Sequence, residues 1–284
     1  MNRKTPNLAD QSPSEMPLSD EMLPAQRREH LIEWFENNHA ASSQDLARMF
    51  GISVSTVRRD LDLLASEGLV KRTHGGAVAL RNRSTWEPTT DEARITAAEE
   101  KQAIAREALT FVKPGQALLI DTGGVVCHLL ADELAKLNIP LTVITNDLYV
   151  ANALTYRENI ALHVPGGALR FGSYSLLGSP GEEFLKDIRC DIFFMSAAAV
   201  DETCVSETVL ELSQLKRAMV DAARDVILLA DSARFMERAL HRTVPIERIS
   251  RIITDDGLTA KSRERFPSPS PAFHIAPMQP QDRA

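Results

Sequence analysis

The chain has 284 residues, of which 44% are hydrophobic and 25% are charged, and its formal net charge is −7. This length exceeds the usual size of one domain, and the composition excludes a wholly disordered or fibrous chain. The negative charge excludes a protein that coats nucleic acid along its whole surface, yet residues 24–83 carry nine Lys and Arg against seven Asp and Glu, which gives +2 there and −9 elsewhere.

Cysteine usage and hydropathy exclude two further classes. Cys127, Cys190 and Cys204 are far apart and form no CxxC pair, so we expect neither a disulfide framework nor a zinc site, and no cofactor. The N-terminus lacks a signal-peptide pattern, and no apolar segment approaches the roughly 20 residues that span a bilayer. We therefore expect a cytoplasmic protein without membrane contact.

Residues 1–22 are rich in Pro, Ser, Asp and Glu and predict a flexible leader, and three helices are predicted in the next stretch. Leu31, Ile32, Trp34 and Phe35 fall on one side of a helix over residues 26–37. Ser43 stands at the expected N-cap of a short second helix, which Gly51 ends.

The third helix is the most regular. Ser53 stands at its N-cap, Gly68 at its end, and its apolar residues repeat at spacings of three, four and three: Val54, Val57, Leu61 and Leu64. Residues 69–78 then read as two short strands with a bend at Gly75-Gly76. Residues 23–80 therefore predict a small winged helix-turn-helix domain.

After a polar linker at 81–98, short apolar runs alternate with helical segments in residues 99–258. The runs are Ala117–Ile120, Leu141–Thr145, Ile160–Val164, Ile192–Met195, Val226–Ala230 and Ile249–Thr254. Because these runs are continuous rather than alternating, they indicate strands buried on both faces of a mostly parallel sheet. We expect a larger, doubly wound α/β domain here, and a loose, proline-rich tail at 259–284.

The polar face of the third helix has the residue types that read DNA. Ser53, Ser55 and Thr56 can bond base edges or phosphates, and Arg58 or Arg59 can bind guanine through two hydrogen bonds. Lys71, Arg72 and His74 lie in the wing, where they can hold the DNA backbone. An arginine pair alone would more often be solvated surface, but the succession of capped helices and wing favours binding to double-stranded DNA.

Residues directly after the strands are candidates for a ligand site, because ligands bind beyond the carboxyl ends of parallel strands. Asp121-Thr122-Gly123-Gly124 follows the first run and precedes a helical segment, where an anion can bind, although a plain strand-to-helix turn looks the same. Thr145-Asn146, Gly166-Gly167 and Asp231-Ser232 follow other runs. Glu211 and Lys216 lie on one predicted helix at a spacing of five, so they need not share a face.

The segment ISVSTVRRDLDLLASEGLVKRTHGGA resembles the N-terminal signature of the DeoR/GlpR family of bacterial regulators. From the joined domains we expect a dimer or tetramer that holds two heads at spaced half-sites of an operator. The resemblance extends to about Leu258 and implies a repressor of carbohydrate genes. It also implies a C-terminal half similar to sugar-phosphate isomerases, which senses a phosphorylated sugar or related metabolite. By this resemblance, the effector-binding residues are Asp121, Thr122, Gly123, Gly124, Thr145, Asn146, Gly167, Arg170, Glu211 and Lys216.

The chain departs from the family pattern at three places. Gly124-Val125-Val126 stands where the family has Thr or Ser hydroxyls that bind phosphate. Ser196-Ala197-Ala198-Ala199-Val200-Asp201 replaces a stretch with glycines, which reduces backbone freedom. Arg234 replaces a lysine, which keeps the charge and changes the donor geometry. These departures leave open whether the loop still binds phosphate.

Three other functions are alternatives. A sugar-phosphate isomerase would need a carboxylate and a lysine, which Glu211, Asp121 and Lys216 offer, but it leaves the DNA-binding head unexplained, so we expect no enzyme. A second alternative is an α/β half that serves only in oligomerisation. A dinucleotide oxidoreductase is disfavoured because no GxGxxG follows a predicted strand. The operator, the effector and the direction of its response are left open.

Overall fold

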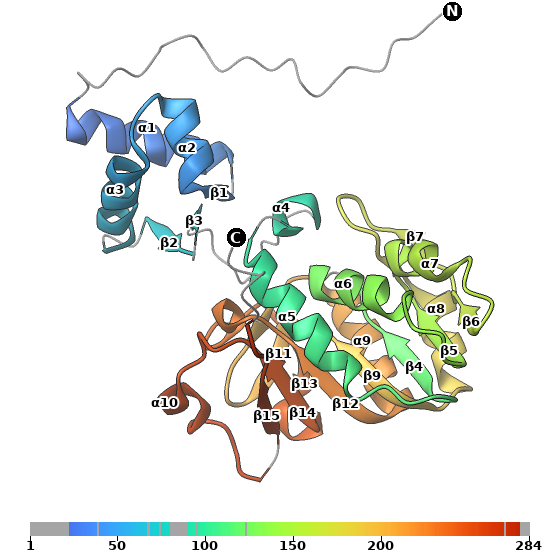
Figure 1. Cartoon of the computed structure of the whole chain (residues 1–284). Coiled ribbons are helices and arrows are strands. Elements are labelled where there is room, and N and C mark those ends of the chain that lie inside the picture. Colours follow the sequence, from blue (N-terminus) through green and yellow to red (C-terminus); the bar gives the residue numbers. More distant parts are fainter. Residues whose placement is uncertain are drawn as a thin grey trace, which may run out of the picture. The chain divides into compact units, whose positions relative to one another are not determined.

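The computed structural model describes residues 23–38, 40–66, 69–73, 75–79, 90–94, 96–122, 124–269 and 271–278. The chain divides into two compact units, residues 1–80 and 81–284 (Figure 1), which are called the N-terminal and C-terminal units below. The predicted leader at 1–22 and residues 81–89 of the predicted linker lie outside the described residues. No helix in the described ranges combines the length and apolar character that a membrane crossing requires.

The N-terminal unit has three helices and a small antiparallel sheet. The helices are α1 (Pro24–Asn37), α2 (Ser43–Phe50) and α3 (Val54–Ser66), and the strands are β1 (Ala40–Ser42), β2 (Val70–Arg72) and β3 (Gly76–Ala79). The strand order is β1-β3-β2. The predicted helices and the two wing strands are confirmed, and β1 is an additional strand that pairs with β3.

The cap of α2 differs by one residue from the prediction. Ser42, not Ser43, is the N-cap, and its hydroxyl accepts a hydrogen bond of 3.0 Å from the Asp45 amide. Ser42 has extended backbone angles because it also ends β1, whereas Ser43 is already helical and its side chain is buried. Gly51 ends α2 with a φ of 64°, as its position predicts.

A buried ion pair joins α1 to α3. The Arg27 guanidinium donates to both carboxylate oxygens of Asp60, at 2.5 and 3.1 Å, and the two side chains are 13% and 6% exposed. On the same side of α3, Val57, Leu61 and Leu64 pack into the apolar core with Leu31 and Phe35 of α1. The inner face of α3 is therefore fixed by packing and by a charged contact with defined geometry.

The C-terminal unit is built on a seven-stranded sheet in which every strand pairing is parallel. The strand order is β15-β14-β12-β9-β4-β5-β6. The strands are β4 (Ala117–Ile120), β5 (Leu141–Thr145), β6 (Ile160–His163), β9 (Cys190–Met195), β12 (Ala223–Leu229), β14 (Arg251–Thr254) and β15 (Ala272–Ile275). All six runs predicted from the sequence are strands of this sheet.

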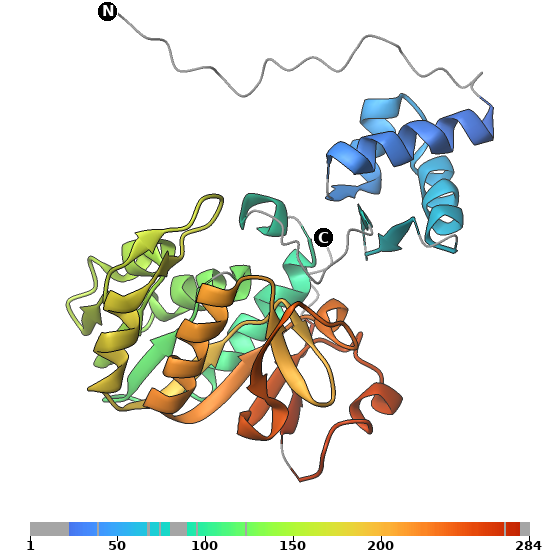
Figure 2. The same cartoon turned by 180° about the vertical axis from the view of Figure 1, so that it is seen from behind.

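Helices cover both faces of the sheet (Figures 1 and 2). One face carries α5 (Ala98–Leu109), α6 (Val125–Leu134) and α7 (Leu148–Leu154), and the other carries α8 (Ser179–Lys186) and α9 (Leu210–Ala222). Successive strand residues point to opposite faces, so Leu118 and Ile120 pack under α6 while Leu119 packs with the α9 side. Two apolar layers explain why the strand sequences are continuously hydrophobic.

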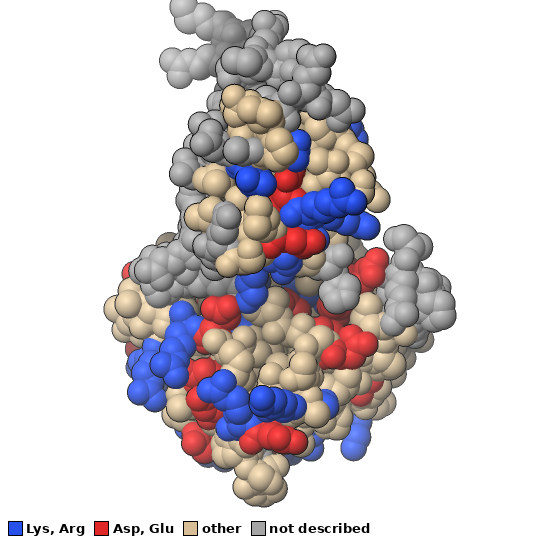
Figure 3. All heavy atoms as spheres, turned by 90° about the vertical axis from the view of Figure 1, so that its left-hand side faces the viewer, with Lys and Arg blue, Asp and Glu red and all other residues tan. Residues whose placement is uncertain are grey.

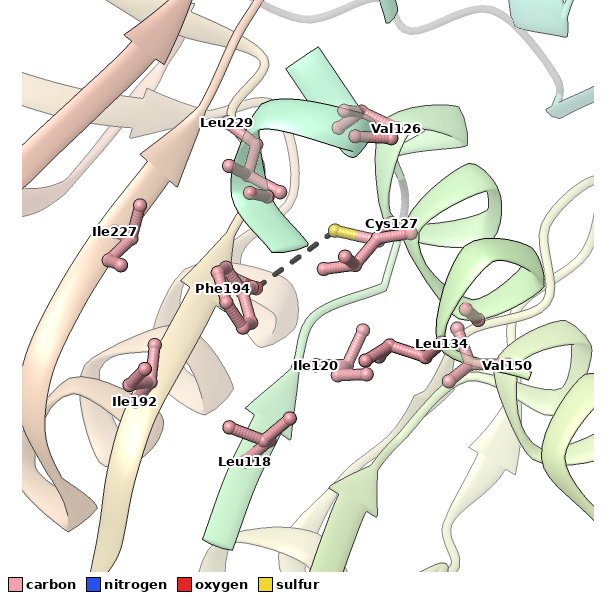
Figure 4. Packing of buried hydrophobic residues seen from close by; sticks show 14 of the residues in the cluster. Leu118, Ile120, Val126, Cys127, Leu134, Val150, Ile192, Phe194, Ile227 and Leu229 are labelled. Carbon is pink, nitrogen blue, oxygen red and sulfur yellow. Dashed lines mark hydrogen bonds between the residues drawn. The ribbon is translucent and has the colours of Figure 1, made fainter. Parts of the chain in front are cut away.

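The layer under α6 is shown in Figure 4. Cys127 of α6 lies among Ile120, Phe194 and Leu229, and its thiol lies 3.9 Å from the Phe194 carbonyl oxygen. These residues come from three adjacent strands, β4, β9 and β12, with α6 packed across them. The helix is thereby held rigidly against the centre of the sheet.

Smaller elements complete the C-terminal unit. A hairpin of β7 (Ala168–Leu169) and β8 (Leu176–Leu177) follows β6, and a second, antiparallel sheet has the order β10-β11-β13. Its strands are β10 (Ala199–Val200), β11 (Cys204–Glu207) and β13 (His241–Pro245). Short helical turns are α4 (Thr90–Arg94), η1 (Ser232–Arg234), η2 (Ile246–Arg248) and α10 (Ala260–Arg263).

The predicted loose tail at 259–284 is wrong for the residues that the structure describes. Residues 260–263 form α10, and Ala272–Ile275 form β15, which pairs in parallel with β14. Phe273 packs edge-on against Phe266, with ring centroids 5.2 Å apart. The prolines flank β15 rather than interrupt it, and an edge strand tolerates prolines at its ends. The strand has four residues, which is too short a run to predict from the sequence.

We predict that Asp60→Asn lowers the free energy of unfolding of the N-terminal unit by about 3 kcal/mol, because it removes the carboxylate from a largely buried ion pair with Arg27. Chemical denaturation monitored by the fluorescence of Trp34, which lies in α1, measures this. Asp62→Asn is the matched control, since Asp62 is on the same helix, 65% exposed, and pairs with Arg72. It should cost less than about 1 kcal/mol, and equal losses in the two variants would contradict the role of the buried pair.

Candidate DNA-binding and effector sites

The outer face of α3 carries the predicted DNA-reading side chains. Ser55, Arg58 and Arg59 are exposed and Thr56 is half-buried, while Val57, Leu61 and Leu64 on the inner face are at most 1% exposed. Val54, which was expected among the anchors, is only partly buried against the same core. The helix therefore presents two guanidinium groups and several hydroxyls to solvent from a rigid base.

Hydroxyl groups cluster at the N-terminus of α3. The Ser53 hydroxyl accepts a 3.1 Å hydrogen bond from the Thr56 amide, so Ser53 has the capping role predicted for it. The same hydroxyl lies 2.8 Å from the hydroxyls of both Ser55 and Thr56. A helix N-terminus with exposed hydroxyls is suited to a phosphate or a base edge.

The wing residues divide into different roles. Arg72 donates to Asp62 of α3 at 2.7 Å and to the carbonyl of Gly76 in β3, so its guanidinium ties the wing to the outer face of α3. Lys71 is half-buried on β2. His74 lies outside the described residues. Sequence reasoning assigned Arg72 to DNA contact and did not find this bracing role.

The charged side chains of one face of the molecule are shown in Figure 3. On this face, Lys and Arg side chains are interspersed with Asp and Glu over both units, and they do not form one broad basic field. This mixture favours DNA attraction through a few placed groups, for which Arg58 and Arg59 are the candidates.

In the C-terminal unit, the order of connection along the sheet reverses between β4 and β9. The chain moves outward from β4 through β5 to β6, and then returns to the other side of β4 with β9. The loops after β4 and β9 therefore diverge and leave a crevice at their carboxyl ends, which is where open α/β sheets bind ligands. Asp121, Thr122 and Gly124 follow β4, and Ser196 and Ala197 follow β9.

A buried lysine joins the two sides of this crevice. Lys216 of α9 lies 2.9 Å from Asp121 Oδ2, 2.5 Å from Glu207 Oε1 and 2.8 Å from the Ser196 carbonyl oxygen, and its side chain is 1% exposed. Burial alone would lower the pKa of Lys216, but the carboxylates of Asp121 and Glu207 overcome this and raise it above its usual value. Lys216 is a fixed cation.

The carboxylate that contacts Lys216 does not come from the same helix. Glu211 is exposed in the first turn of α9, whereas Glu207, at the end of β11, is 1% exposed and contacts Lys216. A spacing of five places Glu211 on a different side of the helix from Lys216, which is why the sequence did not settle their relation. Glu207 had no signal of its own, because it enters the cluster from the second sheet.

A second chain of contacts runs from the same loop to α4. Thr122 Oγ1 donates to Asp147 Oδ2 at 2.7 Å, and His128 Nε2 lies 3.0 Å from the same oxygen. Arg94 of α4 lies 3.0 Å from His128 Nδ1 and over the ring of Tyr149, 4.6 Å from its centroid. Because a guanidinium only donates, Nδ1 accepts, and the His128 proton is on Nε2, where it is donated to Asp147.

Asp147 is held as a carboxylate within this chain. Burial alone would raise its pKa, but hydrogen bonds from His128, Thr122 and the Val150 amide lower the pKa below its usual value. The other oxygen, Oδ1, caps α7 by accepting from the amides of Tyr149 and Val150 at 2.8 and 3.1 Å. None of these links except Thr122 was identified from the sequence.

The ends of β4 and β5 carry two buried acceptor atoms. Asp121 Oδ1 and Asn146 Oδ1 have no hydrogen-bond partner within the described residues. Thr145 donates to the Ile120 carbonyl, and Asn146 Nδ2 donates to the Leu176 carbonyl at 3.3 Å, so Thr145 and Asn146 also join neighbouring segments. Buried polar atoms without partners are costly, and they are what a ligand with hydroxyl groups would satisfy.

A cavity of about 20 Å³ lies at the start of α6. It is lined by Ala93, Lys101, Gly124, Val125, Val126, Ser196, Ala197, Leu229, Ala230, Asp231 and Arg234. A side chain at Gly124 would place its Cβ 2.5 Å from Ser196 Cβ, so glycine is required by the close approach of the two loops. The cavity has room for about one water molecule and is therefore closed to a metabolite in this structure.

The lid of this cavity is α4, and Lys101 holds it there. Lys101 Nζ donates to the Ala93 carbonyl at 2.7 Å and to the Thr96 carbonyl, and its residue is 4% exposed. Burial lowers the pKa of Lys101 to about 8, against the opposing effect of Asp231. Arg94, also on α4, adds the His128 contact described above.

The remaining predicted effector residues lie in or near the β7–β8 hairpin. Gly167 has a φ of 138°, and a Cβ there would lie 2.5 Å from the Leu177 carbonyl oxygen, so this glycine allows the hairpin strands to cross closely. The Arg170 amide donates to the Ser175 carbonyl at 2.9 Å. It is the β8 side, through Ser175 and Leu176, that contacts Thr122 and Asn146. Gly123 lies outside the described residues.

The three cysteines are buried free thiols. Burial raises the pKa of Cys190 to about 11 and that of Cys127 well above its usual value, so these groups stay protonated near neutral pH. Among the residues that the structure describes, no three His, Cys, Asp or Glu side chains are grouped so that they could hold a metal ion.

Comparison with known proteins gives two family matches and many relatives. Residues 27–83 match the model of the DeoR-like helix-turn-helix domain, and residues 96–256 match that of the DeoR C terminal sensor domain. The HTH-type transcriptional regulator GolR of Listeria innocua is 31% identical over 247 residues, which cover 86% of this chain and 96% of that protein. The glycerol-3-phosphate regulon repressor of Escherichia coli K12 is 31% identical over 241 residues, covering 82% and 92%.

Solved structures show more distant likenesses. Ribose 5-phosphate isomerase A from Methanocaldococcus jannaschii aligns with a TM-score of 0.38 and 18% identity, covering 50% of this chain and 56% of that one. The translation initiation factor eIF-2B of Pyrococcus horikoshii aligns with a TM-score of 0.44 and 12% identity, covering 83% of each chain.

The two matched models cover most of the chain, and the structure agrees with both. The N-terminal unit exposes one face of α3 beside the wing, and the C-terminal unit is built on a parallel sheet. The protein is a DNA-binding transcriptional regulator and belongs to the DeoR family.

Proposed function

We propose that this regulator represses genes of carbohydrate metabolism and that a phosphorylated small metabolite controls its binding to a double-stranded operator. The observation that carries the proposal is the small cavity at the reversal of the sheet. Its lining includes two cationic side chains, Lys101 and Arg234, and one carboxylate, Asp231, which lies 3.6 Å from Arg234. Relatives include a repressor named for the glycerol-3-phosphate regulon, which supports a phosphorylated effector.

Operator reading is assigned to the outer face of α3. Arg58 and Arg59 are exposed on a helix whose inner face is fixed by the core and by the Arg27–Asp60 pair. Substitution of either arginine should therefore alter the contact with DNA without altering the fold. A guanidinium that binds guanine through two hydrogen bonds contributes about 1–3 kcal/mol of discrimination. Ser53, Ser55 and Thr56 would contact phosphates or base edges at the helix start, and Lys71 would contact the backbone.

Effector binding is assigned to the carboxyl ends of β4, β5, β9 and β12. The valines at the start of α6 supply no hydroxyl, so the phosphate would be held by Lys101 and Arg234 together with the amides at that helix start. The free acceptor oxygens of Asp121 and Asn146 would receive hydroxyl groups of the ligand. This division separates a cationic end of the site from an accepting end.

The closed cavity also suggests how binding is transmitted. A metabolite requires a pocket of a few hundred Å³, so it can enter only if α4 moves away from the start of α6. Moving α4 breaks the contacts of Ala93 with Lys101 and of Arg94 with His128. The effector and α4 therefore exclude each other from the start of α6. Because α4 begins at Thr90, close in sequence to the DNA-binding head, its release can be transmitted to that head.

Two heads are needed to read an operator made of two half-sites, so we propose that the chain acts as a homodimer or a tetramer. Coupling of about 1–3 kcal/mol between effector and operator is then enough for regulation.

The contacts of Lys216 disfavour an isomerase. All three Lys216 protons are engaged, by Asp121, Glu207 and Ser196, so this lysine has no free proton to transfer.

Arg58→Ala should abolish specific retention of operator DNA, because it removes a bidentate base contact without touching the core. Fluorescence anisotropy with operator and scrambled duplexes at fixed salt measures this. Arg224→Ala is the matched control, since Arg224 is also exposed, at 67%, but lies on β12. Retention that is unchanged in Arg58→Ala, with an intact thermal transition, would remove this residue from the reading face.

Effector affinity should fall as pH rises through about 8. An anion beside Lys101 favours its charged form and raises its pKa above about 8, so the complex holds more protons than the free protein. A phosphate monoester is already dianionic there, since its second pKa is about 6. Calorimetric titration with glycerol 3-phosphate and ribose 5-phosphate from pH 7 to 9.5 should show about a tenfold loss of affinity.

Lys101→Met is the matched variant for this titration. It should bind the same compound more weakly at pH 7 and lose the pH dependence between 7 and 9.5. A wild-type affinity that does not vary with pH, or a variant that keeps the wild-type dependence, would show that the phosphate does not lie beside Lys101. Absence of binding by any phosphorylated sugar would favour a C-terminal unit that serves only in oligomerisation.

A further inference from the structure

A second, larger cavity is lined by residues that the effector cavity does not share. Its volume is about 380 Å³, and it is bounded by α9, β11, β13 and the turn η2. An adjoining cavity of about 290 Å³ shares Cys204 and Arg242 with it. A volume of this size is in the range of sites that hold small metabolites.

Positive charge is in excess in the larger cavity. Three arginines and one aspartate line it: Arg217, Arg242, Arg248 and Asp221. Asp221 is 2.9 Å from Arg248, so that pair is neutralised. Among the residues that the structure describes, the Arg217 guanidinium donates to two carbonyl oxygens, of Thr243 at 3.0 Å and of Arg242, and to no carboxylate. Within the described ranges, the Arg242 guanidinium makes neither an ion pair nor a hydrogen bond.

Two guanidinium groups thus face one cavity without a carboxylate partner, in a chain whose net charge is −7. The Arg217 contact with the Arg242 carbonyl also fixes the two residues beside each other. Paired guanidiniums are the usual protein ligands for carboxylate and phosphate groups, because their donors match two oxygens at once. The charged side of the cavity is therefore suited to an anion.

The other walls are apolar. Cys204, Val220 and Val244 are each at most 6% exposed and form the inner surface together with Pro245. Inorganic phosphate alone would leave these walls without a partner. The ligand that fits both surfaces has one anionic group and a small carbon body.

We propose that the cavity between α9 and β13 is a second ligand site, which binds a small organic anion that carries a carboxylate or a phosphate group. The site is separate from the effector cavity, with which it shares no lining residue. Its walls are nevertheless adjacent to the Lys216 cluster. Arg217 follows Lys216 on α9, and Cys204 lies on the same strand as Glu207. A ligand here contacts the two elements that hold the buried lysine in place.

The test is a calorimetric titration of the full-length protein with phenyl phosphate, benzoate, inorganic phosphate and phenol. Saturable binding of phenyl phosphate or benzoate with one site per chain, and at least tenfold weaker binding of phenol, is expected. Whichever of phenyl phosphate and benzoate binds more tightly identifies the anionic group. Inorganic phosphate should bind more weakly than phenyl phosphate, since it does not contact the apolar walls.

Two variants locate the binding. Arg242→Ala should weaken the binding at least tenfold, because it removes a guanidinium that would contact the anion. The fold should be unaffected, since this guanidinium makes neither an ion pair nor a hydrogen bond with another described residue. Lys101→Met, which alters the effector cavity, should leave the binding unchanged. The proposal is overturned by no saturation up to about 10 mM, by affinity that Arg242→Ala leaves intact, or by affinity that Lys101→Met removes. A change of mass in sedimentation on Arg242→Ala, without ligand binding to the wild type, would make the cavity an interface between copies.

Discussion

The C-terminal unit depends on one buried cation. Lys216 lies where the loops after β4 and β9 diverge, and it contacts Asp121 from one side of the crevice and the Ser196 carbonyl from the other. Glu207 brings the second sheet to the same point. Removing Lys216 would leave two buried carboxylates without this shared cation, so the lysine fixes the three segments relative to one another. The crevice is consequently a rigid frame, and α4 is the part that can move.

The DNA-binding head uses the same principle on a smaller scale. The Arg27–Asp60 pair and the apolar contacts of Leu61 hold the inner face of α3, so Arg58 and Arg59 extend from a fixed base. Arg72 braces the wing against Asp62, which lies on the outer face of the helix. Charged groups are thus divided between fixing the elements and reaching out to DNA. This division explains how a chain with negative net charge presents a local basic face.

Much of this arrangement follows from the sequence, and the failures have physical causes. Continuous apolar runs predicted six strands because burial on both faces removes any alternation. The edge strand β15 was missed because it is short and flanked by prolines. Contacts distant in sequence were also missed: no pattern in the sequence indicates that Asp60 pairs with Arg27, and Glu207 reaches Lys216 only through the fold. The predicted cap of α2 was one residue too late because nothing in the sequence predicts β1, whose last residue, Ser42, is the cap.

In the proposed function, a metabolite and α4 compete for the start of α6. Hydrogen–deuterium exchange of the amides in residues 90–101 measures this competition, with the protein free, bound to operator, and bound to a phosphorylated sugar that releases it. The effector should accelerate exchange in this segment while the strands β4 and β9 stay protected. Release of DNA with unchanged exchange in residues 90–101 would show that α4 does not compete with the effector.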